Sequence, residues 1–178
     1  LMSRLQGEMA CSNDYLSRPE TMVRLLAAGL KRLWSVDIAD CPIRNLVEDK
    51  LASARIRVDR GLVDLDDWEP DTAAEVGCDS PRQLLEYLIA HRPAEEELVF
   101  SHGDYCLPNV FFHEDRVSGF IDLGRSGAAD KWQDIALCVR SLRHNTGDDR
   151  CRDLLFRELG VMPDEDKIRY YILLDELF

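Results

Sequence analysis

Three polar residues of this sequence have the types and the spacing that phosphoryl transfer requires. Asp104 ends the segment SHGD, Asn109 follows five residues later, and Asp122 lies 18 residues beyond Asp104. One carboxylate can orient an attacking hydroxyl group or accept its proton. A second carboxylate and an amide oxygen are hard donors of the kind that Mg²⁺ prefers beside nucleotide phosphates. The pattern H-G-D-x4-N with a distant Asp therefore indicates a kinase-like phosphotransferase.

Each aspartate taken singly has a plainer interpretation. Asp104 follows a glycine and Asp122 lies two residues before one, and both are ordinary turn sequences. The combination with Asn109 favours the functional interpretation, because all these residues lie at the ends of predicted strands. His102 is expected to pack in the loop and hydrogen-bond it, rather than to act as a general base.

Short apolar segments on both sides of these residues predict strands. The strands are expected at residues 98–101, 110–112 and 117–121, with a polar turn at 113–116. A hairpin returns its second strand beside its first. Asn109 before the hairpin and Asp122 after it should therefore converge on one metal ion.

Most of the remaining sequence predicts helices. Ser17 precedes Glu20, and Ser80 precedes Gln83, at the spacing of a capping box. Apolar periodicity and capping residues predict the others: one near residues 45–60, one through residues 135–142, one capped by Asp148 and closed by Gly160, and one capped by Asp164. The acidic stretch 64–79 is expected to be loop or short helix. The fold class is α+β, mainly α, with a small inserted β hairpin.

Composition and net charge limit the classes of partner and the cellular location that we expect. The net charge of −12 makes nucleic acid an improbable partner and would attract a polycationic substrate, although solubility alone also explains such a charge. The sequence has no run of 18 apolar residues and no secretory signal, so we expect no membrane span and a cytoplasmic location. The six cysteines show no zinc-type spacing.

The chemistry-bearing segments also resemble a known family. The pattern is similar to the protein-kinase signature H-R-D-x4-N with D-F-G, with Gly103 and Leu123 as the variant positions. The segments SHGDYCLPN, GFIDLGRSGAADKWQDIA and YYILLDELF resemble the aminoglycoside 3'-phosphotransferases. These bacterial resistance kinases use ATP and Mg²⁺ to phosphorylate kanamycin-type antibiotics. The resemblance covers essentially the whole chain and implies the C-terminal lobe of a protein-kinase-like fold, with metal-binding residues on the hairpin.

The resemblance implies a role for each matching position. Asp104 would position the sugar 3'-hydroxyl, Asn109 and Asp122 would be the Mg²⁺ ligands, and Arg125 would lie on the substrate side. Residues 1–12 would form the inter-lobe hinge, and residues 13–178 the catalytic and substrate-binding lobe. Within the hinge, backbone groups that meet the adenine of ATP are expected at Met2, Ser3 and Leu5.

The resemblance also gives the acidic residues a use, because aminoglycosides are polycations that carboxylates bind. One expected set lies in the loop around Trp68, at Asp66, Asp67 and Glu69. A second lies in the final segment, at Asp175, Glu176 and the carboxylate of Phe178. For the loop acids, a solvated face remains the alternative. His144 and Asn145 stand where family members often carry acids, so the set of accepted aminoglycosides need not be the one usual in the family.

The family also has an N-terminal lobe with a phosphate-covering loop and a strand lysine, and no such pattern precedes Leu1. We therefore expect part of a longer enzyme, which alone would bind ATP poorly. The leading hypothesis is ATP-dependent 3'-O-phosphorylation of aminoglycosides, conferring resistance. One rival is a related small-molecule kinase for choline, homoserine or a sugar. The other is a non-catalytic fragment that binds the cationic antibiotic.

Overall fold

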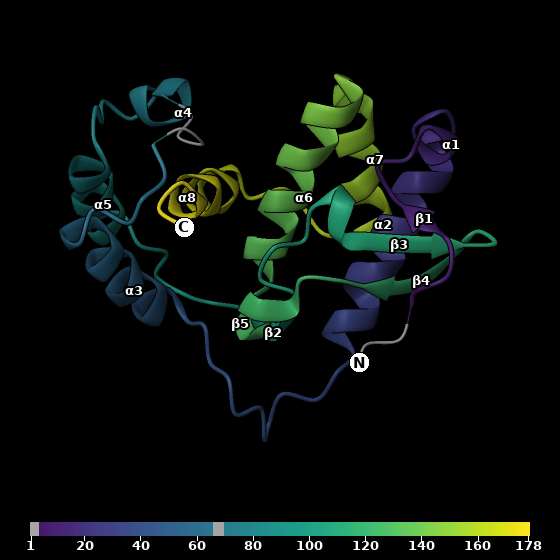
Figure 1. The fold of residues 1–178 in the computed structure, drawn as a ribbon, viewed down its shortest axis with the longest axis horizontal. Helices are drawn as coiled ribbons and strands as arrows, with labels where there is room; N and C mark the ends of the chain where they lie inside the picture. The colour runs from purple at the N-terminus through teal and green to yellow at the C-terminus, as the bar shows by residue number, and fades with distance from the viewer. Residues whose placement is uncertain (1–3, 66–69) are drawn as a thin grey trace.

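The computed structural model describes residues 4–65 and 70–178. Helices account for most of the described residues, which confirms the prediction of a mainly α fold (Figure 1). The helices are α1 (Asn13–Leu16), α2 (Pro19–Trp34), α3 (Val47–Asp59), α4 (Pro70–Ala74), α5 (Pro81–Ala90), α6 (Lys131–Thr146), α7 (Asp149–Leu159) and α8 (Glu165–Asp175). Within the described ranges, no helix has the length and apolar character needed to cross a membrane.

The strands form two small antiparallel sheets. They are β1 (Glu8–Met9), β2 (Leu98–Ser101), β3 (Val110–His113), β4 (Arg116–Phe120) and β5 (Gly127–Asp130). One sheet has the order β1-β3-β4, and the other pairs β2 with β5. The strands predicted at 98–101, 110–112 and 117–121 are confirmed to within one residue at each end.

The β3–β4 hairpin forms at the predicted place, with a tighter turn than the one expected at residues 113–116. Val110 pairs with Phe120 at its base, and His113 pairs with Arg116 at its tip. The two turn residues, Glu114 and Asp115, have φ values of 49° and 52°. Two consecutive positive φ values match the right-handed twist of a hairpin. The hairpin therefore carries Asn109 and Asp122 at the two sides of its open end.

Strand β5 was not predicted. Its sequence, Gly-Ala-Ala-Asp, has little intrinsic preference for a strand. It forms because Ser101 pairs with Gly127 and Leu98 pairs with Asp130, and because Ala128 N–H donates to Ile43 O at 2.9 Å. The β2–β5 ladder therefore closes the segment between Ser101 and Gly127 at its base. All three candidate catalytic and metal-binding residues lie within that segment.

Helix α6 is the centre of the helical packing. Its residues from Trp132 to Val139 are all buried. It packs against α7 and α8, and α8 in turn packs against α5, so α8 lies between α6 and the α3–α5 pair (Figure 1). The 3-10 turn Leu107–Asn109, which precedes β3, also contacts this buried helix.

The predicted helix caps were correct in three of four places. Ser80, Asp148 and Asp164 each accept a backbone N–H from the first turn of their helix. The prediction that Ser17 caps α2 was wrong. Ser17 ends α1 in a helical conformation, and its hydroxyl donates to Asp14 O at 2.8 Å. Pro19, whose φ is set for the first helical position, starts α2 after Arg18 instead.

Candidate active site

Asp104 and Asn109 lie together in the loop after β2. The Nδ2 group of Asn109 donates to the backbone oxygen of Asp104 at 3.0 Å and to its Oδ2 atom at 3.1 Å. Asn109 is buried at the end of a short 3-10 turn, whereas Asp104 is partly exposed. The amide thus fixes the rotamer of a carboxylate that solvent can reach.

Asp122 comes to the same place from the other side of the hairpin. Ile121 N–H donates to Asn109 O at 3.0 Å, so Asp122 follows a residue that is bonded directly to Asn109. Asp122 is exposed and has φ 56° and ψ 51°, a left-handed conformation that Asp tolerates better than most residues. The structure therefore brings Asp104, Asn109 and Asp122 into one neighbourhood, as the spacing predicts.

His102 lies in the interior beneath this loop. Its ring is fully buried and packs edge-on against the rings of Tyr105 and Phe120, with 6.0 Å between ring centroids in each pair. Its Nδ1 atom accepts the backbone N–H of Asp104 at 3.3 Å. A buried ring that is bonded to the loop backbone has the packing role expected for it.

Asp134 holds the loop from below and was missed by the sequence analysis. It lies in the first turn of α6, is fully buried, and accepts His102 N–H at 2.7 Å and Gly103 N–H at 2.9 Å. Burial raises the pKa of Asp134, and the donated N–H groups oppose that shift. Gln133, its neighbour, donates to Gly103 O at 2.7 Å. The available signal was a charged residue beside the apolar run that begins at Ile135.

Glycine is required at position 103. Its φ is +88°, and an added Cβ would lie 2.1 Å from the backbone oxygen of Arg125. The loop that carries Asp104 therefore touches the loop that follows Asp122. Asn45 reinforces this contact by donating to the same oxygen of Arg125 at 2.9 Å.

A cavity of about 530 Å³ opens beside the catalytic loop. Its walls come from five places in the sequence: Asp64; Cys106 and Pro108; Arg125; Leu137, Arg140, Ser141, His144 and Asn145; and Asp175, Glu176 and Phe178. The structure thus gathers the predicted Arg125, Asp175, Glu176 and Phe178 around one space. His144 and Asn145 line the same space from α6.

Two arginines hold the acids of this cavity. Asp175 accepts Arg125 Nη1 at 3.0 Å and also accepts Arg140 Nη2. Glu176 accepts Arg140 Nη1 at 3.2 Å, and its side chain is only 3% exposed. Glu176 therefore serves first to hold Arg140, whereas Asp175 keeps 17% of its side chain accessible. Arg140 was not predicted as a site residue, because its partners lie 35 and 36 residues away in the sequence.

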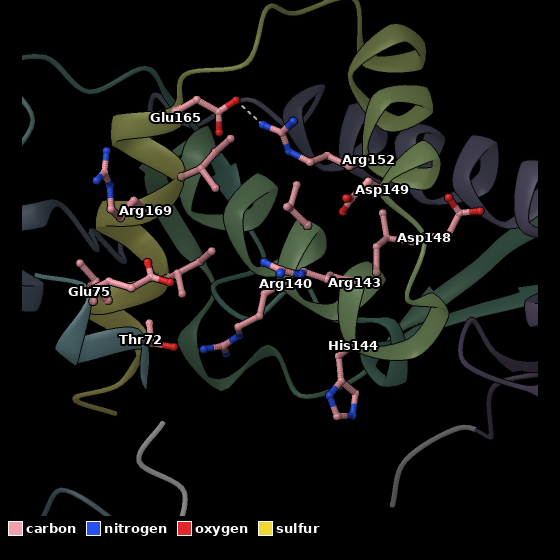
Figure 2. A pocket seen from close by; sticks show the side chains of 15 residues that line it. Thr72, Glu75, Arg140, Arg143, His144, Asp148, Asp149, Arg152, Glu165 and Arg169 are labelled. Atoms are coloured by element: carbon pink, nitrogen blue, oxygen red, sulfur yellow. Dashed lines mark hydrogen bonds and ion pairs between the residues drawn. The ribbon is translucent and has the colours of Figure 1, made fainter. Parts of the chain in front are cut away.

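A larger cavity of about 790 Å³ lies between α4, α6, α7 and α8 (Figure 2). Figure 2 shows Arg140 and Arg143 extending from α6 toward α4 and α8, His144 projecting from the end of the same helix, and Arg152 of α7 paired with Glu165 of α8. Among the described residues that line this cavity, none belongs to the catalytic loop. The smaller cavity is therefore the one beside the loop that carries Asp104, and Arg140 and His144 line both.

The remaining predicted residues are placed only in part. The side chain of Leu5 lies against Gly119 of β4, where an added Cβ would be 2.7 Å from Leu5 Cδ2. Met2 and Ser3 lie outside the described residues, as do the loop acids Asp66, Asp67 and Glu69.

The side-chain oxygens of Asn109 and Asp122 suit a magnesium ion whose coordination shell also includes phosphate oxygens. In the part of the chain that the structure describes, no group of three His, Cys, Asp or Glu side chains could hold a metal. Mg²⁺ commonly takes one or two protein oxygens and fills its shell with phosphate and water. The Nδ2 group of Asn109 is used by Asp104, which leaves its Oδ1 atom for a metal.

Lys50 of α3 lies near Phe178, which forms part of the wall of the smaller cavity. Its Nζ atom lies 5.5 Å from the centre of the Phe178 ring. Burial, aided by the nearby charge of Arg125, lowers the pKa of Lys50 to about 8. An ordinary lysine has a higher pKa, so between about pH 8 and pH 10.5 the unfolded chain binds more protons than the folded one. The stability contribution of Lys50 therefore rises with pH across that window.

Replacing Lys50 by methionine should thus stabilise the protein at pH 7, by about 1–3 kcal/mol. The gain should shrink as the pH rises from 8 to 10.5, because the buried amine of the parent then becomes neutral. Urea unfolding of both proteins at pH 7 and pH 9.5 measures this difference. A gain that is equal at the two pH values would contradict the assignment of the effect to Lys50 ionisation.

Comparison with known proteins settles the family. The sequence matches the phosphotransferase enzyme family over residues 1–171. It is 47% identical to an aminoglycoside 3'-phosphotransferase of Enterococcus faecalis and 46% identical to one of Staphylococcus aureus. Each match covers 100% of this chain and 67% of the relative. The chain belongs to the aminoglycoside 3'-phosphotransferase family.

Solved structures agree with this family assignment. The fold of the chain superposes on a crystal structure of a type VIII aminoglycoside 3'-phosphotransferase with a TM-score of 0.88 at 31% identity. That match covers 99% of this chain and 67% of the solved one. A Streptomyces rimosus aminoglycoside phosphotransferase, solved with ADP and streptomycin, matches at 30% identity with a TM-score of 0.85, over 98% of this chain and 68% of that one. The described residues thus form the C-terminal lobe of a kinase-like fold.

Proposed function

We propose that this phosphotransferase chain carries the acceptor side of an enzyme that transfers the γ-phosphoryl group of ATP to the 3'-hydroxyl of an aminoglycoside. The observation that carries the proposal is the position of Asp104. Its carboxylate is fixed by Asn109, is partly exposed, and lies in the loop whose residues Cys106 and Pro108 line the acid-bearing cavity.

In this proposal, Asp104 receives the substrate hydroxyl. The 3'-oxygen forms a bond to the γ-phosphorus, and the bond from that phosphorus to the β,γ-bridging oxygen breaks, so ADP leaves. The hydroxyl proton passes to the Asp104 carboxylate. Because little covalent chemistry is asked of the protein, positioning carries most of the rate enhancement. The Asn109 amide and the Asp134 anchor supply that positioning.

Asn109 Oδ1 and the Asp122 carboxylate would hold Mg²⁺ in the same proposal. When bound, the ion neutralises negative charge on the nucleotide phosphates. The hairpin base keeps the two donors adjacent through the Ile121–Asn109 hydrogen bond. We place adenine contacts at the backbone of Met2, Ser3 and Leu5, in a hinge formed by residues 1–12. Residues 13–178 would form the catalytic and substrate-binding lobe.

Asp175 is the proposed first contact for an ammonium group of the antibiotic. It lines the cavity, keeps part of its carboxylate accessible, and already bridges Arg125 and Arg140. Glu176 supports it through Arg140, and Phe178 closes the wall. The overall charge of −12 favours the approach of a polycation. Asp66, Asp67 and Glu69, which lie outside the described residues, are proposed to add further carboxylates for the antibiotic.

The enzyme would act in the bacterial cytoplasm and confer resistance. The test is incubation of the full-length protein with ATP, Mg²⁺ and kanamycin, with the product's phosphate position read by NMR. We expect 3'-phosphorylated kanamycin and no product from tobramycin, an aminoglycoside that lacks the 3'-hydroxyl. Choline and homoserine serve as further controls. Turnover of either that equals or exceeds kanamycin turnover would reject the proposed substrate class.

A further inference from the structure

The C-terminal segment is held by a residue that lies outside the cavity. Arg57 of α3 donates from Nε to Leu177 O at 2.8 Å and from Nη2 to Phe178 O at 2.7 Å. Its guanidinium carbon also lies 5.8 Å from the centre of the Phe178 ring. Leu177 O is a backbone carbonyl oxygen, whereas Phe178 O belongs to the last residue, whose carboxylate is one of the expected substrate-binding groups. Arg57 therefore fixes the course of the chain there and also holds that carboxylate. It does not contact the carboxylates of Asp175 and Glu176 in these bonds.

The same guanidinium holds a second wall of the cavity. Arg57 Nη2 also donates to Leu62 O at 2.9 Å, and Leu62 N–H donates back to Arg57 O at 2.8 Å. Leu62 lies two residues before Asp64, which lines the cavity. One side chain therefore joins the segment that leads to Asp64 and the segment that carries Asp175.

Arg57 contacts the segments that form these two walls without lining the cavity itself. It is absent from the described lining of the cavity, and it is only partly exposed. The other arginines of this region have a different task, because Arg125 and Arg140 bond the carboxylates directly. The planar fork of an arginine suits this geometry, since it can reach several oxygens at once.

We infer that Arg57 is a positioning residue for aminoglycoside binding: it holds the Asp64 segment and the Asp175–Phe178 segment in register, and thereby sets the affinity for the cationic substrate. The inference rests on the proposed function, because it concerns the same cavity. It predicts a change in the KM for the aminoglycoside. It predicts no change in the KM for ATP, because Asp104, Asn109 and Asp122 are held by other bonds.

The test compares Arg57→Met with Arg55→Met in the full-length protein. Arg55 is exposed on the same helix, and two residues apart places it on a different face. For Arg57→Met we expect the KM for kanamycin to rise about tenfold, with kcat and the KM for ATP within about twofold of the parent. Arg55→Met should leave all three constants within about twofold. Arg57→Lys, which keeps the charge and part of the donor capacity, should give an intermediate KM.

A readout without substrate separates this inference from the proposed function. The amides of Leu177 and Phe178 donate to Leu174 O and Asp175 O, and they should exchange with deuterium about tenfold faster in Arg57→Met. If the parent phosphorylates no aminoglycoside, the proposed function fails, and so does the role in binding. If the parent is active but the KM for kanamycin is unchanged, only the inference is overturned. If Arg57→Met does not fold, unchanged exchange and an unchanged KM in Arg57→Lys overturn the inference equally.

Discussion

Replacing Asp104 by asparagine should lower the turnover of kanamycin by about 10²- to 10⁴-fold. The substitution keeps the shape of the side chain but removes the carboxylate that accepts the hydroxyl proton. It also leaves the Asn109 Nδ2 group without its anionic partner at 3.1 Å. Because Asp104 is partly exposed, the stability of the protein should change little. Steady-state kinetics with kanamycin and ATP measure the loss.

The matched control is Asp153→Asn, an exposed aspartate on α7. It should retain turnover within about twofold, because a surface charge far from the loop contributes little. The KM for kanamycin should also stay close to its parent value in Asp104→Asn, since the proposed binding acids are intact. Turnover that remains within about tenfold of the parent would show that Asp104 is not the group that positions the hydroxyl.

Replacing Asp134 by alanine should destabilise the protein by about 2–5 kcal/mol, because it leaves one buried N–H group without an acceptor and a second with only the Ser101 hydroxyl oxygen. Those groups belong to His102 and Gly103, immediately before Asp104. The variant should also lose turnover at a temperature where it is still folded, since the loop that carries the proposed catalytic carboxylate is no longer anchored. Urea unfolding gives the first quantity, and kinetics at low temperature give the second.

Asp134→Asn separates the two effects. Asparagine keeps one acceptor oxygen but presents an NH₂ group to the other backbone N–H, so we expect a smaller loss of about 1–3 kcal/mol. Asp166→Ala, which removes an exposed surface partner of Arg169, is the control and should cost less than about 1 kcal/mol. A loss below 1 kcal/mol in Asp134→Ala would mean that the buried carboxylate does not hold the loop.

The sequence by itself determined what depends on local interactions. Strand β2, the β3–β4 hairpin and the caps at Ser80, Asp148 and Asp164 each follow from side chains within a few residues. The same is true of the proximity of Asn109 and Asp122, because a hairpin brings the residues at its two ends together. The resemblance to the family was based on the segments SHGDYCLPN, GFIDLGRSGAADKWQDIA and YYILLDELF, and the comparisons confirm the family.

Only the tertiary structure decided what depends on partners far along the chain. Strand β5 has a sequence with little strand preference and exists because β2 lies beside it. Asp134 became visible as an anchor only once α6 was packed beneath the catalytic loop. Arg57 reaches oxygens 120 and 121 residues away, and no local pattern marks such a bond. The candidate catalytic and metal-binding residues lie in short sequence motifs. The residues that hold the segments of the site, such as Asp134 and Arg57, do so through contacts that form only when the chain folds.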